Sequence, residues 1–142
     1  MTYLLDTCVV SEFTRKVPDA KVINFLNELN DIDVALSVIS IGEIKCGIES
    51  VSERRKRTTL DKWFANELLP RFSNHIIGVD SDTMMEWGKM IAVLKRKGVT
   101  LPVMDSLIAA QCRQHDLCIV TRNVKDFEPT EISIRNPWSN NS

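Results

Sequence analysis

Four short segments carry acidic or amide side chains that could bind a metal ion or activate water. They are Asp6 in LLDTCVVSE, Glu43 in SVISIGEIKCGI, Asp105 in VMDSLIAA, and Asn123 with Asp126 in IVTRNVKDF. Asp6 interrupts an apolar run, and a buried carboxylate without a partner is costly. If these groups converge, neighbouring like charges raise one another's pKa unless a cation lies between them.

The donor types indicate which cation that would be. Oxygen ligands without histidine suit a hard divalent ion, Mg²⁺ or Mn²⁺. Basic side chains near the motifs are few, Lys45 and Arg122, so a metal ion accounts better for the clustered acids. Such an ion positions water and neutralises a phosphate during in-line displacement.

Each acidic position also has a simpler interpretation. Asp6 or Thr7 could cap the following helix. Ser40 and Glu43 form an S-x-x-E capping box, and Asp105 at a helix start gains from the helix dipole. The last motif could be only a polar turn. Taken one at a time, these interpretations are preferred; their joint occurrence favours a site.

Helical spacing supports convergence of the two helical acids. At 100° per residue, Asp105 lies beside Ile108 and Cys112, at the edge of an apolar face rather than opposite it. Glu43 lies on a stripe of small residues, which lets another element approach closely. We therefore expect both carboxylates to face inward.

Strands and helices that could position these residues alternate along the chain. Strands are predicted over 2–6, 33–37, 76–80, 118–122 and 132–137. Helices are predicted from about Cys8, over 20–29, from Ser40 onward, over 57–69 before Pro70, over 82–98 with Gly98 as the stop, and over 104–115. Apolar strands in this alternation predict an α/β fold, a three-layer α/β/α sandwich with a central parallel sheet. The ligand site of such a sheet lies at the carboxyl ends of its strands, where the strand order switches.

Length and composition set the remaining limits. The 142 residues, 44% of them hydrophobic and 26% charged, suit one soluble domain, which we expect over 1–138 with a disordered tail over 139–142. No apolar run reaches the roughly 20 residues of a membrane span, and no basic leader precedes Asp6. Four cysteines without a CxxC pair or nearby histidines predict reduced thiols and a cytoplasmic location.

Charge gives little support for bulk attraction to nucleic acid. The net charge is −1, although 53–57 (ERRKR) and 95–97 (KRK) are locally basic. Lys45, Arg54, Arg55 and Arg57 are candidate contacts to an RNA backbone. A solvated helix face remains the preferred interpretation, because no aromatic residues interleave these cations to stack bases.

The motif set, in this order and spacing over essentially the whole chain, resembles the PIN-domain ribonucleases. It is most similar to the VapC-type toxins of type II toxin–antitoxin modules, and the closing RNPW is similar to the end of a FitB-related subgroup. The resemblance implies a PIN-like sandwich and a Mg²⁺-dependent endoribonuclease, with Mn²⁺ as a substitute. It also implies a homodimer and a small cognate antitoxin that blocks the site in a toxin–antitoxin hetero-oligomer, with no membrane association.

The same resemblance implies roles for individual residues. Asp6, Glu43 and Asp105 match the three acidic positions and are the implied metal ligands. Asn123 matches the fourth position, with Asp126 assisting in the same motif and Thr121 as a hydroxyl that lines the site. Water would then attack the RNA phosphodiester and leave a 5′-phosphate.

Two departures and two alternatives accompany this hypothesis. Cys8 stands where relatives often have Asn or Ser, and the neutral Asn123 removes a charge from any second metal site.

A phosphotransfer domain phosphorylated on Asp6 is one alternative. However, a haloacid-dehalogenase-like phosphatase needs a second Asp where Cys8 stands, and a receiver domain matches only through Lys125. A catalytically inert PIN-like binding module is the other alternative, although Asp6, Glu43 and Asp105 are all present.

Overall fold

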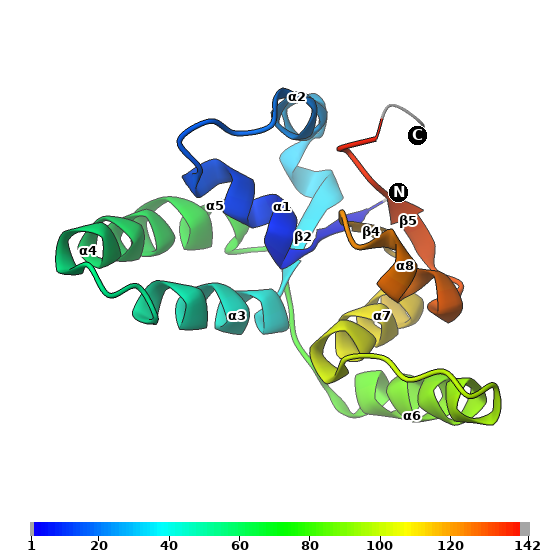
Figure 1. The fold of residues 1–142 in the computed structure, drawn as a ribbon. Helices are drawn as coiled ribbons and strands as arrows, with labels where there is room; N and C mark the ends of the chain where they lie inside the picture. Colours follow the sequence, from blue (N-terminus) through cyan, green and yellow to red (C-terminus); the bar gives the residue numbers. More distant parts are fainter. Residues whose placement is uncertain (1, 140–142) are drawn as a thin grey trace.

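The computed structural model describes residues 2–139, in which five strands form one parallel sheet of order β3-β2-β1-β4-β5 (Figure 1). The strands are β1 (Tyr3–Leu5), β2 (Val34–Ser37), β3 (Ile76–Ile77), β4 (Cys118–Val120) and β5 (Ser133–Arg135). In register, Leu4 of β1 pairs with Ala35 of β2 on one side and Ile119 of β4 on the other. The predicted parallel sheet is confirmed. Its order differs from the 2-1-3-4-5 order of receiver domains, so the receiver alternative is wrong.

The helices fill the connections between these strands. They are α1 (Thr7–Ser11), α2 (Ala20–Glu28), α3 (Val38–Glu49), α4 (Arg54–Trp63), α5 (Leu69–Phe72), α6 (Ser81–Arg96), α7 (Val103–His115) and α8 (Val124–Phe127). Shorter turns are η1 (Glu12–Thr14), η2 (Asp31–Asp33), the π turn η3 (Phe64–Leu68) and η4 (Glu128–Thr130). None of the helices within residues 2–139 has the length and apolarity needed to cross a membrane.

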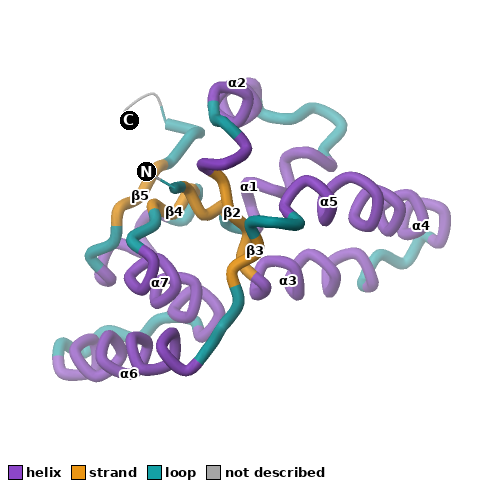
Figure 2. The backbone as a smooth tube through the Cα atoms, turned by 180° about the vertical axis from the view of Figure 1, so that it is seen from behind, coloured by secondary structure: helices purple, strands orange, loops and turns teal. Residues whose placement is uncertain are grey.

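Two hydrophobic cores lie on opposite faces of the sheet, because successive strand side chains point to opposite sides. Leu4 belongs to the core that is completed by α6, α7 and α8. Leu5 belongs to the core that is completed by α1 to α5. Figures 1 and 2 show α6 and α7 on one side of the sheet and α3 and α4 away from them. The predicted three-layer α/β/α sandwich is confirmed.

The start of α3 differs from the prediction. Ser37, the last residue of β2, caps this helix, and its hydroxyl accepts the N–H of Ile39 at 3.0 Å. The helix therefore begins at Val38, and the predicted start at Ser40 is wrong. The predicted Ser40–Glu43 capping box is wrong too, because Ser40 lies inside the helix and its buried hydroxyl has no hydrogen-bond partner among the described residues.

Two further boundaries were set by contacts that the apolar pattern does not show. The helix predicted to stop before Pro70 begins at Arg54, passes through the π turn and continues to Phe72. Pro70 is tolerated because it lies in the first turn of α5, where a backbone N–H is dispensable. The strand predicted over 76–80 ends at Ile77, since the Asp80 carboxylate instead caps α6 by accepting the N–H of Thr83 at 2.9 Å.

Candidate active site

The switch in strand order falls at the carboxyl end of β1. This strand pairs with β2 on one side and with β4 on the other. The chain adds β2 and β3 on the first side of β1 and then crosses over to add β4 and β5 on the second side. Asp6 directly follows β1, and Thr121 directly follows β4. Glu43 lies in α3, the helix after β2, and Asp105 lies in the first turn of α7. The predicted residues thus come from four segments that meet at the edge where a ligand site is expected.

Asp6 is almost fully buried, with 4% of its surface exposed. Its Oδ1 accepts the backbone N–H of Thr7 at 2.8 Å, and its Oδ2 accepts the Thr121 hydroxyl at 2.8 Å. Asp6 is also the N-cap of α1, so the capping interpretation is correct for this residue. These bonds fix the carboxylate between two strand ends, but they supply no positive charge.

Glu43 faces inward, as its stripe of small residues predicts. Its Oε1 accepts the Thr7 hydroxyl at 2.8 Å, which joins α3 to α1 across the site. Thr7 therefore holds one carboxylate by its side chain and another by its backbone N–H. From the sequence, Thr7 was expected only as a possible helix cap; its position directly after Asp6 was the signal that could have identified it as a residue of the site.

Asp105 carries the clearest electrostatic signature of the site. The pKa of its carboxyl is raised from 3.8 to about 6, chiefly by partial burial and then by the negative charges of Asp6, Asp126 and Glu43, in that order. The other three carboxyl groups therefore lie within electrostatic reach of Asp105. Within residues 2–139, none of the four forms an ion pair with a basic side chain.

The two nearby basic residues are engaged elsewhere. Lys45 forms ion pairs with Glu49 and Asp61, both at 3.0 Å, and hydrogen bonding to Asp61 raises the pKa of its ammonium group. The guanidinium of Arg122 lies over the Trp138 ring, 4.5 Å from its centroid. Neither residue neutralises the acidic cluster, which leaves an uncompensated excess of negative charge.

The turn after β4 links the remaining predicted residues. Thr121 is buried, and its hydroxyl oxygen accepts the N–H of Asn123 at 2.9 Å while the hydroxyl donates to Asp6. Asn123 caps α8, and Asp126 follows within that helix. Asn123 and Asp126 line a hollow of about 410 Å³ together with Arg122, Val124, Lys125 and Asn136.

Cys8 lies beside Asp6 and Thr121 in the site. Its Sγ lies 3.8 Å from Asp6 Oδ2 and 3.7 Å from the Thr121 hydroxyl oxygen. Burial raises the pKa of the thiol, a raise partly opposed by a hydrogen bond from the Arg122 backbone and reinforced by the negative charge of Asp6. A neutral thiol is a weak hydrogen-bond donor, so Cys8 adds no further negative charge beside Asp6.

The chemistry of the donors bears on a metal ion. In the described part of the chain, no three His, Cys, Asp or Glu side chains are arranged closely enough to hold a metal ion by themselves. The donors are nevertheless carboxylate oxygens without a counter-charge, which fits a hard divalent cation that keeps several of its waters. The donor set therefore suits Mg²⁺ better than zinc, which prefers nitrogen and sulfur.

The candidate RNA contacts lie apart from the acids. Arg54 and Arg55 are exposed on α4, and Arg57 donates to the Val51 carbonyl at 3.0 Å. A hollow of about 870 Å³ beside α4 is lined by several cations, among them Arg15, Lys16, Arg55 and Lys56. Arg15 and Lys16 were not singled out from the sequence, because they belong to no basic run.

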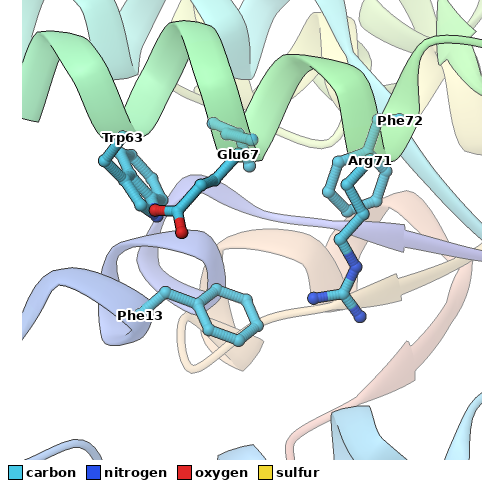
Figure 3. A pocket seen from close by; sticks show the side chains of 6 residues that line it. Phe13, Trp63, Glu67, Arg71 and Phe72 are labelled. Carbon is cyan, nitrogen blue, oxygen red and sulfur yellow. The ribbon is translucent and has the colours of Figure 1, made fainter.

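An aromatic groove lies between η1 and the helical segment that runs from α4 through η3 to α5 (Figure 3). This groove, of about 310 Å³, is lined by Phe13, Trp63, Glu67, Leu68, Arg71 and Phe72. Trp63 also lines a separate hollow of about 240 Å³, whose lining includes Thr7 and Glu43. Trp63 therefore belongs both to the aromatic groove and to a hollow that contains one of the acidic residues.

Comparison with known proteins relates this geometry to a family. Residues 3–130 match the PIN domain. The chain is 30% identical to Toxin FitB of Neisseria gonorrhoeae over 135 residues, 95% of this chain and 97% of that protein. It is 27% identical to VapC ribonuclease Y4jK of Sinorhizobium fredii, over 95% of this chain and 96% of that protein. The crystal structure of FitAcB from N. gonorrhoeae superposes with a TM-score of 0.93 and 30% identity, covering 96% of this chain and 99% of that one. The chain belongs to the PIN-domain family.

Proposed function

We propose that this protein is a Mg²⁺-dependent endoribonuclease and the toxin of a type II toxin–antitoxin pair. The observation that carries the proposal is the cluster of four carboxyl groups without a counter-charge at the strand-order switch. Burial and the other three charges together raise the pKa of Asp105 to about 6. The similarity to a protein named VapC ribonuclease supports RNA as the substrate. A cytoplasmic location follows from this function, because the RNA substrate is there.

The residues of the site have different roles in this proposal: some hold the metal ion, some position the carboxylates and some orient water. Asp6, Glu43 and Asp105 would hold Mg²⁺, or Mn²⁺ in its place. When bound, the ion lowers the pKa of water and stabilises charge on the phosphodiester. Thr121 and Thr7 keep Asp6 and Glu43 in place through the bonds described above. Asn123 and Asp126 would orient water or hold a second ion.

The decisive experiment compares matched aspartate-to-asparagine variants on RNA. Asp6→Asn and Asp105→Asn should abolish Mg²⁺-dependent cleavage while the proteins stay folded. Asp82→Asn is the control, because Asp82 lies exposed in the first turn of α6 as Asp105 lies in the first turn of α7. Full activity of the unchanged protein in EDTA would contradict the metal-dependent mechanism.

The two alternatives from the sequence predict different results. A stable phosphoryl group on Asp6 after incubation with acetyl phosphate would favour a phosphotransfer domain. RNA binding without cleavage, with Mg²⁺ and with Mn²⁺, would favour an inert PIN-like module. The carboxylates of the site argue against the inert module, because their repulsion is offset only by a bound cation, and a bound divalent cation supplies the chemistry of phosphodiester cleavage.

We propose that the cognate antitoxin lies in the aromatic groove and blocks the acidic cluster. Three aromatic side chains, Phe13, Trp63 and Phe72, line this groove, and Trp63 also lines the neighbouring hollow that contains Glu43. Large aromatic residues anchor protein interfaces. The small protein encoded beside this one should inhibit RNA cleavage, and Trp63→Ala should relieve that inhibition without reducing cleavage itself. Equal inhibition of the Trp63→Ala protein would contradict this placement.

We also propose a homodimer through the apolar surface beside Glu43. Val38, Val79 and Met104 are 40%, 39% and 52% exposed and line one hollow of about 700 Å³. Apart from Glu43 the residues that line this hollow are uncharged, and such a largely apolar patch can pair with its own copy in a two-fold interface. Met104→Glu should convert a dimer to a monomer in light scattering after size exclusion. An unchanged mass would place the interface elsewhere.

A further inference from the structure

Arg122 is a cation beside the acidic cluster for which the proposed metal chemistry has no use. It follows Thr121 directly and is exposed, and among residues 2–139 it forms no ion pair with a carboxylate. Its guanidinium instead lies over Trp138, 4.5 Å from the ring centroid. This contact joins the turn after β4 to the closing RNPW segment of the chain.

Trp138 is a fixed platform rather than a loose terminal residue. Its backbone N–H donates to Asn136 Oδ1 at 3.0 Å, and its carbonyl accepts Lys21 Nζ at 3.4 Å. Its ring packs against the hydrophobic core on the α1–α5 side of the sheet. A platform held in this way restrains the guanidinium that lies on it.

The contact with Trp138 leaves the guanidinium able to bind an anion. A cation held over a ring face is attracted by the ring's electrons, so the contact uses none of the guanidinium's N–H donors in a hydrogen bond. Those donors match the oxygens of a phosphate in a two-bond geometry. Because the side chain is already restrained, less conformational entropy is lost when the phosphate binds.

The surroundings of Arg122 have the composition of a phosphate subsite. Its hollow of about 410 Å³ also contains Lys125, Asn123 and Asn136, and the two cations outnumber the single carboxylate, Asp126. Asn136 uses its amide oxygen to accept from Trp138, which leaves its NH₂ group available as a donor. The hollow adjoins the acidic cluster, since the charge of Asp126 acts on Asp105.

We propose that Arg122 and Lys125 bind the RNA backbone phosphate next to the scissile one, with Trp138 as the positioning residue for Arg122. The proposal rests on the ribonuclease function above. It gives the RNPW segment a role in substrate binding. It also accounts for a guanidinium that shares a hollow with Asp126 and lies over Trp138 rather than in an ion pair: its partner is the substrate.

The test measures binding of a fluorescent single-stranded RNA by anisotropy, with the full-length Asp105→Asn protein in EDTA so that cleavage does not intervene. Arg122→Gln should weaken binding about tenfold and reduce the slope of log affinity against log salt by about 0.7, the value for one phosphate on single-stranded RNA. Trp138→Leu should lower affinity in the same way, and Trp138→Phe, which keeps an aromatic face, should restore part of it. Arg96→Gln, at the exposed end of α6, is the matched control and should change neither quantity.

A neutral methylphosphonate placed at each RNA linkage in turn locates the contact. With Arg122 present, one linkage beside the cleavage position should cost affinity when neutralised, and this sensitivity should disappear in Arg122→Gln. Identical sensitivity in both proteins would overturn the proposal, as would an unchanged salt slope in Arg122→Gln.

Cleavage assays separate failure of this proposal from failure of the proposed function. If the protein with Asp105 intact cleaves RNA with Mg²⁺ and Arg122→Gln leaves KM unchanged, the subsite is refuted and the ribonuclease function stands. If RNA binding requires Arg122 but no divalent ion supports cleavage, the subsite stands and the ribonuclease function fails.

Discussion

Replacing Asp105 with asparagine should stabilise the metal-free protein above about pH 6 and should leave its stability unchanged below about pH 4. The reason is the raised pKa of this carboxyl, about 6 in the folded protein against an ordinary value of 3.8. Between these two values the folded state keeps a proton that the unfolded chain has released. The free energy of unfolding therefore falls as the pH rises through this window, and it stays low above it.

The size of the stabilisation follows from the difference between the folded and the ordinary pKa of the Asp105 carboxyl. This pKa difference corresponds to at most about 3 kcal/mol of unfolding free energy. Because the carboxyl is only partly buried, screening by solvent reduces this to about 1 kcal/mol. For a chain of this length, such a gain corresponds to a Tm rise of about 3 °C.

The assay is urea unfolding in EDTA at about pH 4 and about pH 7.5, on either side of the window. Asp82→Asn is measured in parallel, because it removes a first-turn carboxylate that lies outside the site and so reports the lost helix-dipole interaction alone. At the higher pH, saturating Mg²⁺ should make the unchanged protein more stable to urea than Asp105→Asn, since the ion stabilises only a protein that binds it. Two results would refute the idea that the Asp105 charge destabilises the metal-free protein. One is an equal gain in the free energy of unfolding of Asp105→Asn at both pH values. The other is a loss of stability at the higher pH that exceeds the loss in Asp82→Asn.

Three other changes test contacts that hold the site and its scaffold. Thr121→Val removes the hydroxyl that donates to Asp6; the free energy of unfolding should fall by about 1–3 kcal/mol in urea, and kcat for RNA cleavage should fall while KM changes little. Gln111→Leu leaves two carbonyls at the end of β3 without their donor, so stability should fall by about 2 kcal/mol with cleavage by the folded protein unchanged. Glu12→Ala removes the buried oxygen that accepts the Asp19 N–H at 2.8 Å, and its cost of about 2 kcal/mol should appear as a lower Tm.

Each of these outcomes has a contrary result. A stable, fully active Thr121→Val protein would mean that Asp6 does not need this hydroxyl. A loss of cleavage in folded Gln111→Leu would mean that β3 acts on the site. A Tm unchanged in Glu12→Ala would mean that water replaces the lost acceptor at the start of α2.

The local sequence pattern was sufficient to predict a helix or strand whose boundaries depend only on its own residues. The helix predicted over 104–115 is observed over 103–115, because its apolar period continues without interruption to a polar end. Gly98 follows α6 with a φ of +72°, a backbone conformation that glycine adopts at low cost. The apolar, non-alternating strands were likewise enough to predict a parallel sheet covered on both faces.

Boundaries shared between two elements were not predictable in this way. Ser37 and Ser40 are both plausible caps by type, and only the end of β2 places the Ser37 oxygen against the first turn of α3. Pro70 reads locally as a helix stop, but the preceding π turn places it in the first turn of α5, where a proline is tolerated.

The sequence by itself determined which residues carry the oxygen donors and that their strands end at one edge of a parallel sheet. Only the tertiary structure decided how those donors are held, because the bonds join residues far apart in the chain: Thr7 to Glu43, Thr121 to Asp6 and Arg122 to Trp138. Such contacts depend on the strand order, which places β4 beside β1. Local propensity carries no information about that order, so the raised pKa of Asp105 and the stacked arginine beside it emerge only when the sheet is assembled.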